Sequence, residues 1–173
     1  LLSVLVPSRV AGDARCALLC PAILDMRASF PDMDPEGLER YLGYVREEFR
    51  QQQLAGAPTP AVLASIASAL SSLGWRAEEL VDVDGYVADV VAHPPEAGGG
   101  GGVPVAVLHH SEGGTLHLET GEPLGGAVMR QRHLRRRGFA CVNLGGAAWG
   151  ALTVGEQAAL LEGKLATASE RHA

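Results

Sequence analysis

The spacing of the hydrophobic residues changes at Gly74, and this change constrains the fold more than any other feature of the sequence. Before Gly74, apolar residues recur every three or four positions, which is the period of an α-helix. After it, they form short runs or alternate with polar residues, as they do in β-strands. We therefore predict an α+β fold, in which N-terminal helices are followed by a small mixed β-sheet with flanking helices.

Two regular helices are predicted before Gly74. The first begins at Asp34, an N-cap residue followed by proline at the first helical position, and ends near Gln53. The second begins at Thr59 and ends at Gly74, and an earlier, less regular helix is expected over residues 14–28.

The 173 residues are enough for one ordinary domain with a helical extension. We place the boundary between the two regular helices, which gives a helical segment over residues 1–58 and an α/β domain over residues 59–173. Because the chain begins with Leu1 rather than methionine, we expect it to be a piece of a longer protein.

Four strands are predicted after Gly74, over residues 75–81, 86–92, 104–109 and 139–144. The Asp-Gly pair between the first two is a tight-turn signal, so they should form a hairpin. A helix over residues 126–137 separates the last two. Thr153 and Glu156 have the spacing of a capping box and should begin a final helix. The long glycine-rich stretch over residues 93–102 is expected to be a loop.

The net charge of −6 argues against a uniformly basic nucleic-acid-binding protein, but it hides an uneven distribution. Residues 1–125 contain seven arginines and 17 acidic residues, a net charge of −10. Residues 126–173 contain six arginines, one lysine and three acidic residues, a net charge of +4. A basic segment therefore lies in the last third of the chain.

Most of this positive charge lies on the predicted helix over residues 126–137. Its basic side chains are Arg130, Arg132, His133, Arg135, Arg136 and Arg137. At 100° per residue, Arg132, Arg135 and Arg136 share one face, opposite an apolar side that includes Ala127 and Leu134. Guanidinium groups bind phosphate in a bidentate manner and stack on bases, so this helix is the candidate RNA-binding site. The alternative is that the arginines only compensate the helix dipole and solvate the surface.

Asp89 is the second candidate site residue. Strand alternation places its side chain on the same face as Val87 and Val91, in apolar surroundings. A buried carboxylate needs a partner, such as an arginine or a metal ion. We favour a carboxylate bonded to the backbone or to an arginine over a catalytic one.

No metal site, cofactor or membrane partner is predicted. The histidines and glutamates between His109 and Glu119 do not fit a compact zinc-binding pattern. Cys16, Cys20 and Cys141 form neither a CxxC pair nor a secreted framework, which favours a reducing compartment. The apolar run at the N-terminus stops at Pro7, too early to span a bilayer.

Short motifs in the second half of the chain occur in a distinctive order. They are Asp84-Gly85-Tyr86-Val87-Ala88-Asp89-Val90, the apolar strand over residues 105–108, Leu124-Gly125, Arg130-Gln131-Arg132-His133-Leu134, Gly138-Phe139 and Trp149. In order and spacing they resemble the RAP domain, over about residues 60–170. The resemblance implies a restriction-endonuclease-like fold at the C-terminus of an octotricopeptide-repeat type of protein, with residues 1–58 as the end of its helical repeat array.

The same resemblance implies a function. RAP domains occur in organellar RNA-binding proteins, so we expect an mRNA or rRNA partner, and ribosomal proteins as further partners, in a mitochondrion or chloroplast. The protein would act in RNA maturation, stability, translation or ribosome assembly. One alternative is a structural rRNA-binding subunit of an organellar ribosome.

A metal-dependent nuclease is the other alternative, with Asp89 as its catalytic residue. In the nucleases of this fold, an acid on the second strand and a Glu-x-Asp or Glu-x-Lys strand hold the metal. Asp89 matches the first position, but the second motif falls on Ala106-Val107-Leu108. One carboxylate alone is a poor ligand set for a divalent ion, so we predict that the protein is not an enzyme.

Overall fold

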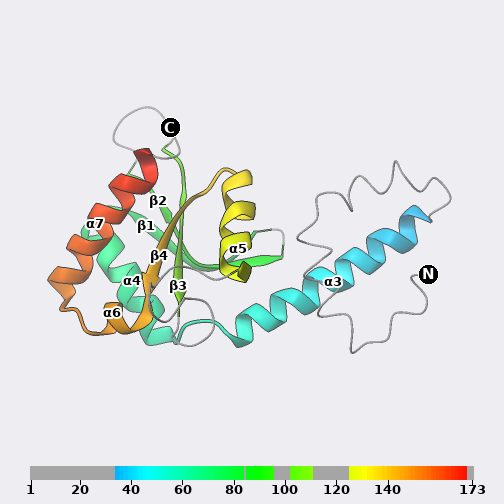
Figure 1. The fold of residues 1–173 in the computed structure, drawn as a ribbon, viewed down its shortest axis with the longest axis horizontal. Coiled ribbons are helices and arrows are strands. Elements are labelled where there is room, and N and C mark those ends of the chain that lie inside the picture. The colour runs from blue at the N-terminus through cyan, green and yellow to red at the C-terminus, as the bar shows by residue number, and fades with distance from the viewer. Residues whose placement is uncertain (1–33, 84, 96–101, 111–124, 171–173) are drawn as a thin grey trace. The chain divides into compact units, whose positions relative to one another are not determined.

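The structure, a computed structural model, describes residues 34–83, 85–95, 102–110 and 125–170 (Figure 1). The chain divides into two compact units. The first comprises Leu1–Gly56 with Asp84–Val87, and the second comprises Ala57–Val83 with Ala88–Ala173. We expected a single boundary, between residues 58 and 59, which would place the hairpin tip in the second domain. The structure instead groups residues 84–87 with the first unit. The helix expected over residues 14–28 and most of the expected glycine-rich loop lie outside the described residues.

The described helix of the first unit is α3 (Pro35–Ala55). It begins as predicted, because the Asp34 carboxylate accepts hydrogen bonds from the backbone N–H groups of Glu36 and Gly37, at 3.2 and 3.0 Å. These bonds satisfy two of the donors that the first turn of a helix leaves without intrahelical partners. The helix continues two residues beyond the predicted end at Gln53.

The last turns of α3 hold the hairpin tip through one amide and one ring contact. Gln53 donates from Nε2 to the carbonyl oxygen of Gly85 at 2.6 Å and accepts at Oε1 from the N–H of Val87 at 3.2 Å. The rings of Phe49 and Tyr86 meet edge to face, with their centroids 5.4 Å apart. Local sequence patterns predicted α3 and the hairpin separately, and did not indicate that they would meet.

The remaining described elements belong to the second unit, except that the first two residues of the second strand, Tyr86 and Val87, belong to the first. In chain order they are α4 (Pro60–Ser72), β1 (Arg76–Val83), β2 (Tyr86–His93), β3 (Val105–His110), α5 (Gly125–Arg136), β4 (Ala140–Gly145), α6 (Gly146–Gly150) and α7 (Val154–Glu170). Each predicted helix and strand of this region is present, with ends that differ by at most two residues. The short helix α6 was not predicted, because two glycines at its start indicated a turn.

The four strands form one mixed sheet in the order β1-β2-β3-β4. β2 and β3 are antiparallel, with Val90 opposite Val107. β3 and β4 are parallel, with Val105 opposite Ala140. This arrangement confirms the predicted α+β class with helices before a small mixed sheet, and it leaves β4 at an edge of the sheet.

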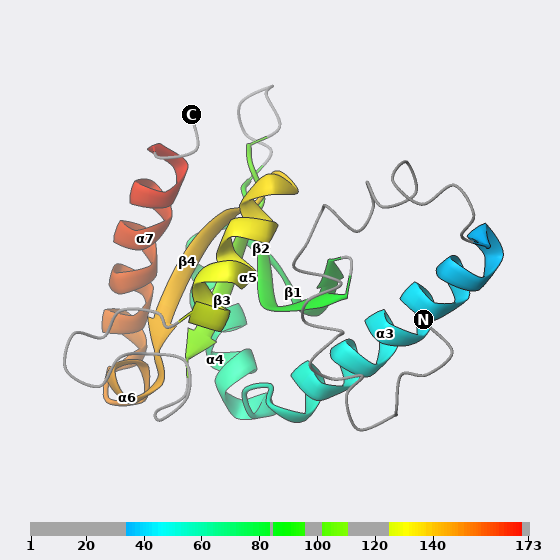
Figure 2. The same ribbon diagram turned by 45° about the vertical axis from the view of Figure 1, so that its right-hand side comes forward.

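Helices cover both faces of the sheet (Figures 1 and 2). α4 and α7 pack against one face and against each other, and the main hydrophobic core lies between them and the sheet. The strand residues in this core alternate along each strand, as in Val90, Val107 and Val142. α5 lies against the other face, so residues one position away in the sequence, such as Asp89 and Asn143, point toward α5.

Trp149 explains why the chain forms α6 after β4. Its side chain is 2% exposed and belongs to the main core, and its indole N–H donates to the hydroxyl oxygen of Ser65 on α4 at 2.9 Å. Gln157 of α7 donates from Nε2 to the Trp149 carbonyl oxygen at 3.1 Å. The short helix therefore inserts one large side chain between α4 and the sheet.

Candidate nucleic-acid interface

The candidate interface is built on α5, which has a well-defined C-terminus. Gly138 follows the helix with φ of 85°, a conformation that favours glycine. The N–H groups of Gly138 and Phe139 donate back to the carbonyl oxygens of Arg135 and Leu134, at 3.0 and 3.1 Å. Arginines in the last turn also compensate the negative end of the helix dipole.

The outward face of α5 presents Arg132, Arg135 and Arg136, as the helical spacing predicted. All three side chains are exposed, and none of them forms an ion pair with another residue in the described part of the chain. Arg137, just past the helix, is also exposed and donates from Nη1 to the carbonyl oxygen of His133 at 3.3 Å.

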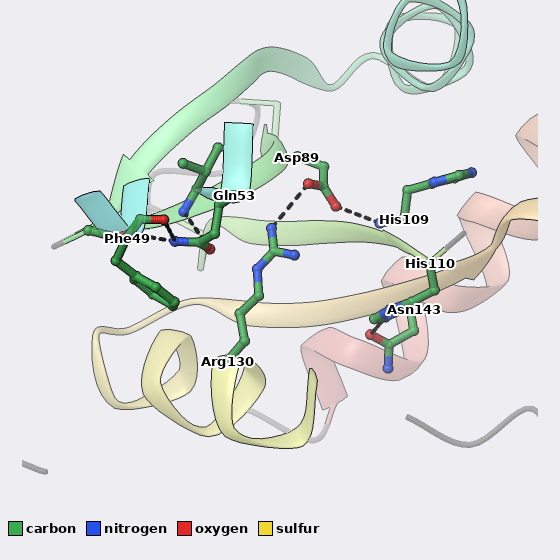
Figure 3. A network of polar contacts seen from close by, with 9 residues as sticks. Phe49, Gln53, Asp89, His109, His110, Arg130 and Asn143 are labelled. Carbon is green, nitrogen blue, oxygen red and sulfur yellow. Dashed lines mark hydrogen bonds and ion pairs between the residues drawn. The ribbon is translucent and has the colours of Figure 1, made fainter. Parts of the chain in front are cut away.

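Arg130 does not belong to this outward face. Its guanidinium donates from Nη2 to Oδ1 of Asp89 at 3.1 Å, and the exposed fractions of the two side chains are 20% and 6% (Figure 3). The other carboxylate oxygen, Oδ2, accepts from the backbone N–H of His109 at 2.8 Å. Asp89 is therefore buried, as strand alternation predicted, and its partners are an arginine and a backbone N–H.

His133 also departs from the set of candidate RNA-binding residues. It lies on the buried side of α5, with 6% of its surface exposed. Burial lowers the pKa of its imidazole, and the neighbouring charges of Arg137 and Arg136 lower it further. A neutral, buried ring cannot supply a phosphate contact at the surface.

A polar triad, which sequence patterns did not reveal, joins α5 to the sheet; His110 and Gln131 are buried and Asn143 is partly buried. Oδ1 of Asn143 on β4 accepts from Nε2 of His110 at 2.9 Å (Figure 3). The same oxygen accepts from Nε2 of Gln131 at 2.7 Å. Burial lowers the pKa of His110, an effect that its hydrogen bond to Asn143 opposes. The sequence did contain one signal for this triad. Asn143 lies within an otherwise apolar strand, and an amide in such a place needs a hydrogen-bond partner.

The surroundings of Asp89 do not resemble a metal-binding site. The residues of β3 on its side of the sheet are Ala106, Leu108 and His110, and the first two are fully buried apolar side chains. Among the described residues, no three histidine, cysteine, aspartate or glutamate side chains form a group that could hold a metal ion. His109 and His110 lie on opposite sides of β3, and the other histidines and glutamates of the considered metal cluster lie outside the described residues.

A cleft of about 570 Å³ runs beside β4, between α5 and α7. Its lining residues are Arg135 of α5, Ala140, Cys141 and Asn143 of β4, and Gly163, Lys164, Thr167 and Ala168 of α7. Burial raises the pKa of the Cys141 thiol to about 11, so the thiol is neutral at physiological pH.

Comparisons with protein-family models, curated proteins and solved structures gave no match. Within the described residues, no single helix is both long enough and apolar enough to cross a membrane. The bent pair Arg46–Ala55 and Pro60–Ser72 meets those criteria together, by length and composition alone.

Proposed function

We propose that this protein binds RNA through the outward face of α5, defined by Arg132, Arg135 and Arg136. By its resemblance to the RAP domain, it would act in a mitochondrion or chloroplast as the C-terminal part of a helical-repeat protein, in RNA maturation, stability, translation or ribosome assembly. The observation that carries the proposal is that these three guanidinium groups are exposed on one short helix without ion-pair partners among the described residues.

The opposite side of α5 supports the proposal because it anchors the helix. Arg130 is bound to Asp89, and Gln131 is bound to Asn143, so two polar contacts hold α5 on the sheet. Leu134 adds a fully buried apolar contact. A helix held in this way presents its outward arginines in a fixed arrangement, which reduces the entropy lost when they bind a phosphate backbone.

A nuclease reaction receives less support from the same residues. Both oxygens of Asp89 accept hydrogen bonds from the protein, one from Arg130 and one from the His109 N–H. A divalent ion at Asp89 would have to displace the guanidinium, and Ala106 and Leu108 beside it offer no oxygen ligands. We therefore propose binding without catalysis.

Filter binding of single-stranded RNA over a series of salt concentrations tests the proposal. The triple variant Arg132→Ala, Arg135→Ala, Arg136→Ala should bind more weakly. The slope of log affinity against log salt should fall by about 2, because each lost phosphate contact on a single strand removes about 0.7.

A matched variant separates a site from a general charge effect. Arg40, Arg46 and Arg76 are exposed arginines outside α5, so changing all three to alanine removes the same charge. This control should keep an RNA affinity and salt slope close to those of the wild type. The proposal is wrong if the α5 variant retains the wild-type slope, or if both triple variants lose affinity equally.

A further inference from the structure

We propose that the cleft between α5 and α7 binds an extended acidic segment of a partner protein, which pairs with the open edge of β4 as a fifth strand. This interaction differs from RNA binding by the outward face of α5, although Arg135 belongs to both surfaces. Three features carry it: the direction of the β4 backbone groups, the space along α7, and the charge of the lining residues.

The backbone of β4 directs groups to the cleft that pair with no other strand in the described part of the chain. The N–H of Ala140 donates to the carbonyl oxygen of Pro104 at 2.9 Å, so Ala140 directs its backbone groups toward β3. Because successive residues of a strand direct these groups to opposite sides, Cys141 and Asn143 direct theirs away from β3. Both residues line the cleft, and no other strand among the described residues lies beside this edge.

The cleft has room for a strand because α7 contributes small side chains to it. Gly163, Thr167 and Ala168 lie along its α7 wall. A Cβ atom added at Gly163 would meet nothing within 4 Å. An added strand would lie about 4.8 Å from β4. The cleft extends from this edge of β4 between α5 and α7, the helices on the two faces of the sheet.

The charge of the cleft selects an acidic segment. Arg135 lies on the α5 wall and Lys164 on the α7 wall, and none of the described residues that line the cleft is acidic. The backbone of Cys141 and Asn143 offers both donors and acceptors. An extended peptide offers a donor and an acceptor at each alternate residue, at the spacing of these groups, whereas the phosphate groups of a nucleic acid supply only acceptors, so these observations favour a peptide.

The probe is a labelled peptide of alternating glutamate and valine, titrated against the full chain by fluorescence anisotropy. We expect saturable binding. Two control peptides, one with lysine in place of glutamate and one with alternate backbone amides N-methylated, should bind at least about tenfold more weakly. The proposal is overturned if the glutamate peptide does not bind, or if either control binds equally well.

Filling the cleft should abolish peptide binding. In Gly163→Leu the new side chain enters the cleft, and the loss of a helical glycine favours folding. The matched control is Gly155→Leu, also exposed on α7 with nothing near an added Cβ but outside the cleft. We expect binding to be lost in the first variant and kept in the second. Equal binding by both variants would overturn the proposal.

Two further measurements place the peptide and separate this proposal from RNA binding. Lys164 is the only lysine of the chain, so a peptide with an amine-reactive end should cross-link there. Hydrogen exchange at the backbone amides of Cys141 and Asn143 should become slower when the peptide is added. The double variant Arg132→Ala, Arg136→Ala should lose affinity for RNA and keep its affinity for the peptide. Slowed exchange of these two amides with RNA and not with the peptide would contradict the proposal.

Discussion

Asp89 shows how the partners of one side chain decide what it can do. A carboxylate on a buried strand could have been a metal ligand, but the structure gives it a guanidinium and a backbone N–H. With these partners Asp89 joins the middle of α5 and the end of β3 to β2. Its burial could be predicted from strand alternation, whereas its pairing with Arg130, 41 residues away, depends on the tertiary fold.

Removing the Asp89 carboxylate should destabilise the fold. Asp89→Ala leaves Arg130 without its carboxylate and the His109 N–H without an acceptor, so we expect the free energy of unfolding to fall by about 3 kcal/mol. Asp89→Asn keeps an acceptor and should lose less. Urea denaturation measures both variants, and wild-type stability in Asp89→Ala would show that the ion pair has no structural role.

His110 should make the stability depend on pH. Burial holds its pKa in the folded state below the ordinary value of 6.5. Between that lowered pKa and 6.5, the unfolded state binds more protons than the folded state, so the free energy of unfolding falls as the pH is lowered through this window.

The check is urea denaturation at a series of pH values, for the wild type and for His110→Gln. The variant should lose less stability than the wild type as the pH is lowered. Some dependence should remain, because burial also lowers the pKa values of His109 and His133. Identical pH slopes for the two proteins would contradict the assignment to His110.

At the scale of elements, α5 shows that helical periodicity can identify the exposed residues of a helix but not the partners of its inward-facing polar residues. The periodicity correctly predicted that Arg132, Arg135 and Arg136 are exposed, because nothing on that side competes with water. Arg130 and His133 were assigned to the binding surface only because they are basic residues of the same helix. The sheet face beneath α5 carries Asp89, His110 and Asn143, so polar residues on the inner side of α5 have partners there.

The contact between α6 and α4 gives a prediction for one hydroxyl group. Ser65→Ala removes the acceptor of the Trp149 indole N–H, which is buried in the core. We expect the free energy of unfolding to fall by about 1–2 kcal/mol.

Ser72→Ala is the matched control, because Ser72 also lies on α4 and its hydroxyl donates only to the backbone, at the Ala69 carbonyl oxygen. Thermal unfolding of both variants should show a larger loss for Ser65→Ala. A loss of equal size in Ser72→Ala would mean that the indole contact contributes nothing beyond the local effect of removing a serine hydroxyl.

At the scale of the whole molecule, the sequence predicted the fold class and the order of elements because these follow from local periodicity. Features that need two distant segments were missed. They include the packing of the hairpin tip on α3, the triad of His110, Gln131 and Asn143, and the cleft beside β4. The parallel register of β3 and β4, which joins residues about 35 positions apart, brings His110 near Asn143. The cleft depends on how α5 and α7 pack beside β4.

The open edge of β4 also bears on whether copies of this protein associate with one another. Sheet edges invite edge-to-edge pairing between identical chains, which is a route to aggregation. Two copies joined through β4 would bring Arg135 and Lys164 of one copy toward the same cations of the other. The resulting repulsion opposes this pairing, so the two side chains proposed to select an acidic strand would also disfavour the joining of two copies through β4.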